Sequence, residues 1–345
     1  MANYSKFESN RSLEEALNIY EQRIADAKSN YVKHNTSFKL RPCPFCGDDR
    51  YDLLDEFHES FKIAKCKQCG SEYVNPCPSK EAISDYYSNG KCNRQLAAVT
   101  GSRKTSFNVD DRVLSIESAM FDKLVNSKRI KILEVGCSSG LFLSNLRNYM
   151  QHKYQDAIFE IFGIDLDAEA IKNKVDEFVH LSCNSAESLT DSDSYENNSY
   201  DLILHYELIE HLIDPFGFMG SVKKLLKPDG LCIFTTPNSY GAENLAVNYN
   251  SRRLLAHGIF PPMHLQAFST HNISLFAYRL GLDVVQVSTP GKLDVDMITL
   301  NKKYLTNDSF VRVANLDDES IKELIQEYTS ACYASSHMQC ILRNS

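Results

Sequence analysis

Residues 132–143 read ILEVGCSSGLFL. An apolar, β-rich run ends near Glu134, Gly136 and Gly140 bracket a turn, and a leucine-rich helical pattern follows. A strand, loop and helix in this order form a nucleotide-type site at the carboxyl end of a strand in open α/β sheets. The glycine spacing is not that of a Gly-x-Gly-x-x-Gly fingerprint, and the Lys-Ser/Thr pair of a P-loop is missing. The stretch predicts a small-molecule site in an α/β sheet.

Short β-rich runs continue along the chain from this stretch. They alternate with amphipathic helical stretches, which is typical of a mostly parallel sheet with helices on both faces. We expect a last strand at 337–343, after the insertion 291–336. The runs preceding that insertion are 130–135, 157–164, 178–181, 200–205, 230–236 and 282–287.

Asp165 directly follows the second run, 25 positions after Gly140. A carboxylate at the end of the second strand can accept both hydroxyls of a ribose. Asp167 lies farther into the turn, and we predict that it caps a helix. A capping role is also the alternative for Asp165.

Five motifs together resemble those of the class I S-adenosylmethionine-dependent methyltransferases: EVGCSSG, GIDLD, NSAESL, YDLILHYELIEHLIDP and LLKPDGLCIFTTPN. The likeness extends over residues 129–290. It implies a Rossmann-like class I methyltransferase fold, a seven-stranded, mostly parallel sheet with helices on both faces.

The resemblance also implies S-adenosylmethionine as the cofactor. Glu134 would orient its methionine end and Asp165 would hold its ribose. The sequence departs from the family pattern at Ser138, where a glycine is usual, and at Ser185, where an acidic residue would meet the adenine amine. The predicted cofactor-binding residues are Glu134, Gly136, Cys137, Ser138, Gly140, Asp165, Leu166, Ser185, Ala186, Glu187, His205 and Tyr206.

Residues 205–215, HYELIEHLIDP, follow a β-rich run directly, so we expect them at the same edge of the sheet. On a helix, Glu207, Glu210 and His211 would share one face and could bind a divalent ion. This arrangement is similar to that of metal-dependent ubiquinone-pathway and small-RNA-end methyltransferases, and His264 is the available fourth ligand for Mg²⁺.

Two other interpretations of this stretch stay open. His264 or His211 could be a general base that deprotonates an acceptor hydroxyl. Alternatively, the Glu-His pair only orients the helix. The candidate catalytic residues are therefore His264, His211 and Glu207. The long connection after residue 236 is expected to build the acceptor pocket, which Tyr240, His257, His264 and Phe268 would line.

Two Cys-x2-Cys pairs, Cys43 with Cys46 and Cys66 with Cys69, lie 19 residues apart. This spacing predicts a structural zinc site, with four unrelated buried thiols as the alternative. Four thiolates leave no open coordination position, so the metal would build structure. We predict an N-terminal helical segment over 1–40, a zinc-ribbon module over 41–80, a helical linker over 81–128 and a methyltransferase domain over 129–345.

Charge and composition exclude several classes of function. Lys plus Arg, 37, against Asp plus Glu, 45, leave a net charge of −8, which argues against broad binding to nucleic acid. The chain lacks an apolar run of the ~18–20 residues that span a membrane. Its start lacks the pattern of a signal peptide, and its 11 cysteines then indicate a reducing, cytoplasmic location.

The order of the cysteine pairs and the methyltransferase motifs resembles a subgroup associated with sugar and surface-polysaccharide modification. It implies methyl transfer from S-adenosylmethionine to a saccharide or a nucleotide-linked sugar, so the expected partner is a small-molecule or glycan acceptor. The alternatives are a metal-dependent RNA-end 2′-O-methyltransferase and a non-catalytic module that binds S-adenosylmethionine.

Overall fold

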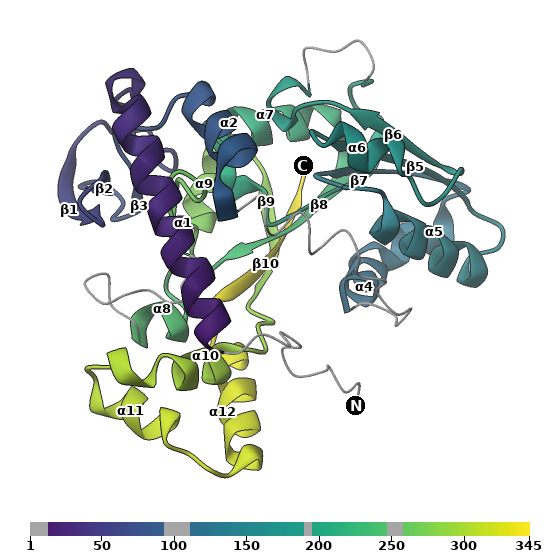
Figure 1. The fold of residues 1–345 in the computed structure, drawn as a ribbon. Helices are drawn as coiled ribbons and strands as arrows, with labels where there is room; N and C mark the ends of the chain where they lie inside the picture. The colour runs from purple at the N-terminus through teal and green to yellow at the C-terminus, as the bar shows by residue number, and fades with distance from the viewer. Residues whose placement is uncertain (1–12, 93–110, 190–194, 247–257) are drawn as a thin grey trace. The chain divides into compact units, whose positions relative to one another are not determined.

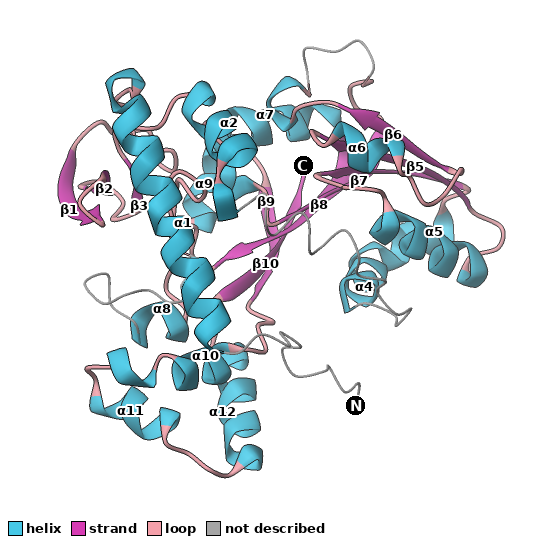
Figure 2. Cartoon of the chain, viewed as in Figure 1, coloured by secondary structure: helices cyan, strands magenta, loops and turns pink. Residues whose placement is uncertain are grey.

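The computed structural model describes residues 13–92, 111–189, 195–246 and 258–345. Seven strands form one sheet in the order β6-β5-β4-β7-β8-β10-β9 (Figures 1 and 2). The ladders β4–β5, β4–β7, β5–β6 and β7–β8 are all parallel, which confirms the predicted Rossmann-like sheet. The strands are β4 Arg129–Val135, β5 Ile158–Asp165, β6 Val179–Cys183, β7 Tyr200–Tyr206, β8 Leu226–Pro237, β9 Asp283–Ser288 and β10 His337–Arg343.

Helices cover both faces of this sheet because successive side chains of a strand point to opposite sides. Ile132, Leu202 and Leu204 face a core formed with helices α4 (Asp111–Asn126) and α5 (Leu141–Lys153). Each fully buried aliphatic side chain of this kind contributes about 1.5–3 kcal/mol.

The other face of the sheet meets a different helix. His205 of β7 packs against Phe218 of helix α7 (Pro215–Leu225), with ring centroids 5.2 Å apart. Helix α9 (Ile273–Leu280) lies against α7 through the rings of Phe276 and Phe216. None of the described helices combines the length and apolar character needed to cross a bilayer.

The chain divides into two compact units. Unit 1 comprises residues 1–103, 237–272 and 288–338, and unit 2 comprises 104–236, 273–287 and 339–345. Unit 2 holds most of the seven-stranded sheet, helices α4, α5, α7 and α9, and the short helix α6 (Ala168–Lys172). Unit 1 holds the cysteine pairs and the connection that follows β8.

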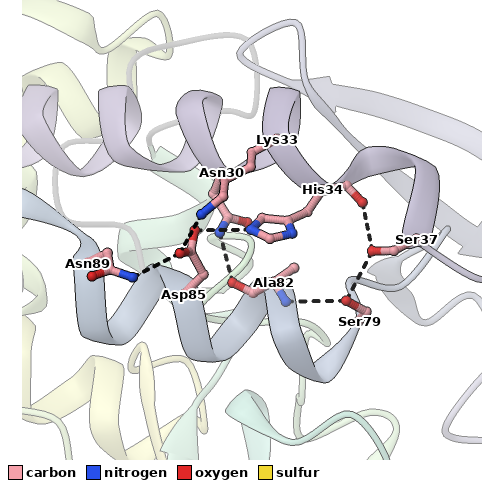
Figure 3. A network of polar contacts seen from close by, with 8 residues as sticks. All are labelled: Asn30, Lys33, His34, Ser37, Ser79, Ala82, Asp85 and Asn89. Atoms are coloured by element: carbon pink, nitrogen blue, oxygen red, sulfur yellow. Dashed lines mark hydrogen bonds and ion pairs between the residues drawn. The ribbon is translucent and has the colours of Figure 1, made fainter.

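In unit 1, helix α1 (Leu13–His34) is joined to helix α2 (Lys80–Asn89) by the polar network in Figure 3. The buried amide of Asn30 donates to the carbonyl of Ala82 at 2.8 Å. Lys33 and His34 both contact the carboxylate of Asp85, at 2.7 and 3.0 Å. These hydrogen bonds hold the pKa of Asp85 well below its usual range, so its carboxylate is charged at neutral pH.

A small antiparallel sheet in unit 1 has the order β1-β2-β3, with β1 Tyr51–Phe57, β2 Phe61–Cys66 and β3 Glu72–Val74. The insertion 291–336 forms three α-helices, for which the sequence analysis made no prediction. A core of the first two includes Ile298 and Ala314, together with Ala246 of helix α8 (Ala242–Ala246). The insertion helices are α10 Asp294–Leu300, α11 Asp308–Ala314 and α12 Glu319–Ala331.

Replacing Gly163 by alanine is expected to destabilise unit 2. A Cβ at this β5 position would lie 2.6 Å from Cys137 Sγ, 2.7 Å from Leu181 Cδ2 and 2.9 Å from Leu143 Cδ1. These atoms approach from three elements, so the strain cannot be relieved by one rotamer change, and overpacking of this kind costs about 1–3 kcal/mol. Urea denaturation measures the loss; Gly220→Ala, where the same atom meets open space, is the matched control, and equal midpoints for the two variants would contradict the packing.

Candidate functional site

The loop between β4 and α5 has the left-handed backbone that glycine favours. Gly136 and Gly140 have φ of +82° and +77°, and Ser138 between them has φ of +49°. The N–H groups of Gly136 and Cys137 both donate to the carbonyl of Ile164, at 2.8 and 3.1 Å, which fixes the loop against β5. Ser138 therefore keeps the conformation of the glycine that is usual there, at the cost of an unfavourable φ for a residue with a Cβ.

Asp165 connects this loop to the end of β5. Its Oδ2 accepts the Ser138 N–H at 2.7 Å and its Oδ1 accepts the Asp167 N–H at 2.9 Å. Each carboxylate oxygen has a further lone pair that can accept from a ligand hydroxyl. Asp167 accepts from the N–H groups of Glu169 and Ala170, which confirms its predicted capping role. Leu166 beside them is 72% exposed, a large apolar side chain open to a ligand ring.

Glu134 lies at the end of β4 and is only 4% exposed. Burial raises the pKa of Glu134 to about 8, with a smaller opposing influence from Arg112 and a further increase from Asp165. Its Oε2 has no hydrogen-bond partner among the described residues. Ionisation of a buried carboxyl group is favourable only if a cation or a hydrogen-bond donor meets the carboxylate. Glu134 therefore fits a cationic ligand group.

Arg112 of α4 is a candidate site residue that the sequence analysis missed. Its guanidinium carbon lies 4.1 Å from the centre of the Phe142 ring and 4.9 Å from that of Tyr206. The two rings meet edge to face at 5.3 Å. The cation–π contacts fix the guanidinium, whose charge lowers the pKa of Glu134 and can also meet an anionic ligand group. A single basic residue in the first turn of a helix looks like a solvated charge in the sequence.

The remaining predicted cofactor residues have varied surroundings. Ser185 caps a short 3₁₀ turn, Ala186–Ser188, by accepting the N–H of Glu187 at 3.2 Å. Cys137 is buried, and burial raises the pKa of its thiol to about 12. The ring of His205 is stacked on Phe234 at 4.5 Å and fully buried, and burial lowers its pKa to about 3. A cofactor contact from His205 is therefore restricted to its main chain.

The stretch HYELIEHLIDP does not begin a helix, contrary to the prediction that Glu207 and His211 lie one helical turn apart. Glu207 has φ of +49°, a left-handed conformation that ends the extended backbone of β7. Only a 3₁₀ turn, Ile209–His211, follows it. The α-helix starts later at Pro215, a residue whose fixed φ favours the first helical position.

Two carboxylates of this stretch are nonetheless held together by consecutive threonines at the end of β8. Thr235 Oγ1 donates to Glu207 Oε1 and Thr236 Oγ1 donates to Glu210 Oε2, both at 2.9 Å. Burial, and then the charge of Glu207, raise the pKa of Glu210 well above its usual range. The Nε2 of His211 lies 3.8 Å from Glu210 Oε1. These three side chains of unit 2 offer the oxygen and imidazole donors that a divalent ion accepts.

The four cysteines come together at one point in unit 1. Their sulfur atoms all lie within 4.8 Å of one another, with Cys43 and Cys69 at 3.6 Å and Cys46 and Cys66 at 3.4 Å. A tetrahedral site with zinc–sulfur bonds of about 2.3 Å has sulfur atoms about 3.8 Å apart, so the set fits zinc. Gly47 and Gly70, both with φ near the left-handed region, follow each pair and donate back to Cys43 and Cys66.

Three of the predicted acceptor-pocket residues, Tyr240, His264 and Phe268, belong to unit 1. His264 is buried and its main chain forms two hydrogen bonds with Phe260. Phe268 is buried against Phe45, with ring centroids 4.9 Å apart, and Tyr240 is 39% exposed. His257 lies outside the described residues.

A family model described as "Methyltransferase domain" matches residues 109–287, more than half of the chain. The chain therefore belongs to this methyltransferase domain family. The matched range contains the β4–α5 loop, Asp165 and the stretch with Glu207 and Glu210.

Curated relatives are similar over a shorter range. The ubiquinone biosynthesis O-methyltransferase of Neisseria meningitidis serogroup A is 28% identical over 116 residues, 31% of this chain and 44% of the relative. That of Actinobacillus pleuropneumoniae serotype 5b is 31% identical over 116 residues, 31% of this chain and 46% of the relative. The chain thus spans less than half the length of these curated relatives.

Solved structures also resemble the chain. The [4+2]-cyclase SpnF has a TM-score of 0.46 at 14% identity, covering 77% of this chain and 96% of its own. A SAM-dependent methyltransferase from Archaeoglobus fulgidus has a TM-score of 0.40 at 14% identity, covering 67% and 94%. Both TM-scores are below 0.5, and the family assignment rests on the sequence match.

Proposed function

We propose that the protein transfers the methyl group of S-adenosylmethionine to a hydroxyl of a small acceptor. The observation that carries this proposal is the buried Glu134 carboxyl group, whose Oε2 is without a partner among the described residues and whose pKa the charge of Arg112 lowers against the effect of burial. A ligand with an ammonium and a carboxylate on one carbon complements this pair. S-adenosylmethionine has both groups and supplies an electrophilic methyl when bound.

Other residues of unit 2 supply the remaining contacts with S-adenosylmethionine. Asp165 accepts the ribose hydroxyls with the lone pairs that its backbone donors leave free. The loop at Gly136–Gly140 brings main-chain N–H groups near the ligand because no side chain projects from either glycine. Leu166 and the Ser185 turn flank the adenine. Together these groups orient the ligand, which is most of what methyl transfer requires of a protein.

We propose a saccharide or nucleotide-linked sugar as the acceptor, cytoplasmic in location, with His264 or His211 as the base that removes its hydroxyl proton. The names of the relatives, ubiquinone biosynthesis O-methyltransferases, support transfer to oxygen and make a phenolic hydroxyl the second candidate. In place of a base, a divalent ion held by Glu207, Glu210 and His211 of unit 2 would lower the pKa of that hydroxyl. The buried, threonine-bonded Glu210 is the observation that favours it.

We also propose zinc at Cys43, Cys46, Cys66 and Cys69, where the sulfur distances fit a closed tetrahedral site. With four thiolate ligands its role is structural.

Purified protein, labelled S-adenosylmethionine and a cytosolic extract separated into nucleotide-sugar, glycan, quinone-precursor and RNA fractions test the acceptor. Label in the sugar or glycan fraction is the expected result. Label only among phenolic quinone precursors would transfer the assignment to the second candidate, and label only in RNA would contradict both. An EDTA arm with zinc restored separates a base from a divalent ion, because only the ion-dependent reaction stops.

Cofactor binding is expected to strengthen as the pH rises. The pKa of Glu134, about 8 against an ordinary 4.5, means that the folded protein without ligand binds one more proton there than the unfolded chain between these values. Its contribution to the free energy of unfolding therefore falls as the pH rises through this window. A ligand ammonium favours the ionised carboxylate, so the gain in Tm caused by S-adenosylhomocysteine should grow between about pH 6 and about pH 7.5.

Thermal shifts with and without ligand measure this gain, together with proton release in titrations run in two buffers of different ionisation enthalpy. The Glu134→Gln variant should show a flat profile. A gain that does not change with pH in the native chain would contradict the role of Glu134.

A further inference from the structure

The cysteine module, residues 39–77, has one sheet edge that another part of unit 1 covers. Its strand order β1-β2-β3 leaves β3 with a free edge. Tyr73 forms an antiparallel bridge with Gln266, the Val74 N–H donates to the Leu265 carbonyl at 2.8 Å, and the Ala267 N–H donates to the Glu72 carbonyl at 2.9 Å. Residues 265–267 thus act as a fourth strand of the module, which removes an exposed edge.

Side-chain contacts to the same segment come from residues adjacent to the cysteines. Phe45, between Cys43 and Cys46, is fully buried against Phe268 with the rings edge to face at 4.9 Å. Arg41, two residues before Cys43, donates to the Leu265 carbonyl at 3.0 Å and to Gln266 Oε1 at 3.2 Å.

The second cysteine pair makes a matching contact. Ser71, two residues after Cys69, accepts from the Cys69 thiol at 3.3 Å and from the Asn272 side-chain amide at 3.2 Å. Asn272 also closes a turn with Ser269, because its Oδ1 accepts the Ser269 N–H and its own N–H donates to Ser269 Oγ. Both pairs of ligands therefore hold the segment through a neighbouring residue.

We infer that the metal-bound cysteine module is the device that positions residues 258–272, the segment that carries His264, and that release of the metal frees this segment while the cofactor site of unit 2 stays intact. The inference rests on the proposed function for the identity of the metal and the role of His264. Without the metal, four thiols within 4.8 Å have no common partner, and the turns that place Phe45, Arg41 and Ser71 lose their constraint. His264 directly precedes the paired residues, so the constraint on its main chain weakens with them.

Arg41 and Phe45 are positioning residues, because they contact residues 265–268 and not the metal. A variant that keeps all four cysteines separates their contribution from that of the metal: Phe45→Ala, with Leu53→Ala as the matched control. Leu53 lies on β1 of the same module and is 54% exposed.

Hydrogen exchange of the full chain, with zinc measured on every sample, tests the inference. On chelation, amides of 265–272 should exchange at least tenfold faster while those of β4 and β5 are unchanged, and S-adenosylhomocysteine affinity should stay within about twofold. Phe45→Ala should reproduce the faster exchange with zinc still bound, or lose zinc more readily by linkage, and Leu53→Ala should do neither. The imidazole resonances of His264 should move to those of a solvated histidine in the same samples.

Unchanged exchange of 265–272 after zinc release, while 41–74 loses protection, would overturn the inference. So would a Phe45→Ala variant that retains native exchange and native His264 resonances. Failure of the native chain to bind S-adenosylhomocysteine would instead count against the proposed function, since that site belongs to unit 2 and is read separately.

Discussion

Glu134→Gln is expected to weaken S-adenosylhomocysteine binding about 100-fold while leaving the unliganded protein folded. Glutamine keeps the size of the side chain but removes the charge that meets the ligand ammonium. Loss of a buried charge-assisted hydrogen bond costs about 2–4 kcal/mol, which is about 30-fold to 1000-fold in Kd. Isothermal titration of both proteins measures the change.

The unliganded variant should be at least as stable as the native chain at about pH 8. Burial of the native carboxylate raises its pKa to about 8, which means that ionising it is unfavourable in the fold, and glutamine has no charge to bury. Glu160→Gln is the matched control, because Glu160 lies on the neighbouring strand β5 in a surface ion pair with Arg129 at 3.3 Å. Equal ligand affinity in the Glu134 variant and the native protein would show that Glu134 does not bind the ligand.

Cys66→Ser is expected to abolish zinc binding and to unfold the cysteine module. Cys66 is 2% exposed at the end of β2, and its loss leaves three thiolates and an open coordination position. Structural zinc sites contribute about 10 kcal/mol or more of apparent free energy in small modules, so the module cannot be stable without it. Elemental analysis and calorimetry measure the metal content and the loss of a cooperative transition.

Cys332→Ser is the control for that experiment, because Cys332 is exposed in unit 1 and has no cysteine at ligand spacing. It should hold one zinc and keep the native Tm. Native zinc content and Tm in Cys66→Ser would show that the four cysteines are only a packed cluster of thiols.

The sheet was predictable from the sequence because its strands are short apolar runs that need both faces covered. The runs at 130–135 and 337–343 correspond to β4 and β10 with ends that agree within a residue. Local chemistry also predicted Asp167, since a helix cap depends on the two or three N–H groups that follow it. The cysteine cluster followed from spacing alone.

Other features depend on contacts that the sequence does not display. Helix α1 ends at His34, where hydrogen bonds from Lys33 and His34 to Asp85, a residue far along the chain, stabilise its last turn. The helix expected at Glu207 is absent because hydrogen bonds to Thr235 hold that residue in a left-handed conformation. Arg112 is a site candidate only through the rings of Phe142 and Tyr206, which are far from it along the chain.

A cofactor site at the β4–α5 loop is tested by an isothermal titration of S-adenosylhomocysteine into the zinc-loaded full chain, with Asp165→Ala in parallel. We expect one site with a Kd on the order of micromolar in the native protein and an affinity loss of at least about tenfold in the variant. Proton release on binding is expected near neutral pH, since the ligand ammonium favours ionisation of Glu134. No binding at millimolar ligand, or equal binding by native protein and variant, would contradict a cofactor site at the β4–α5 loop.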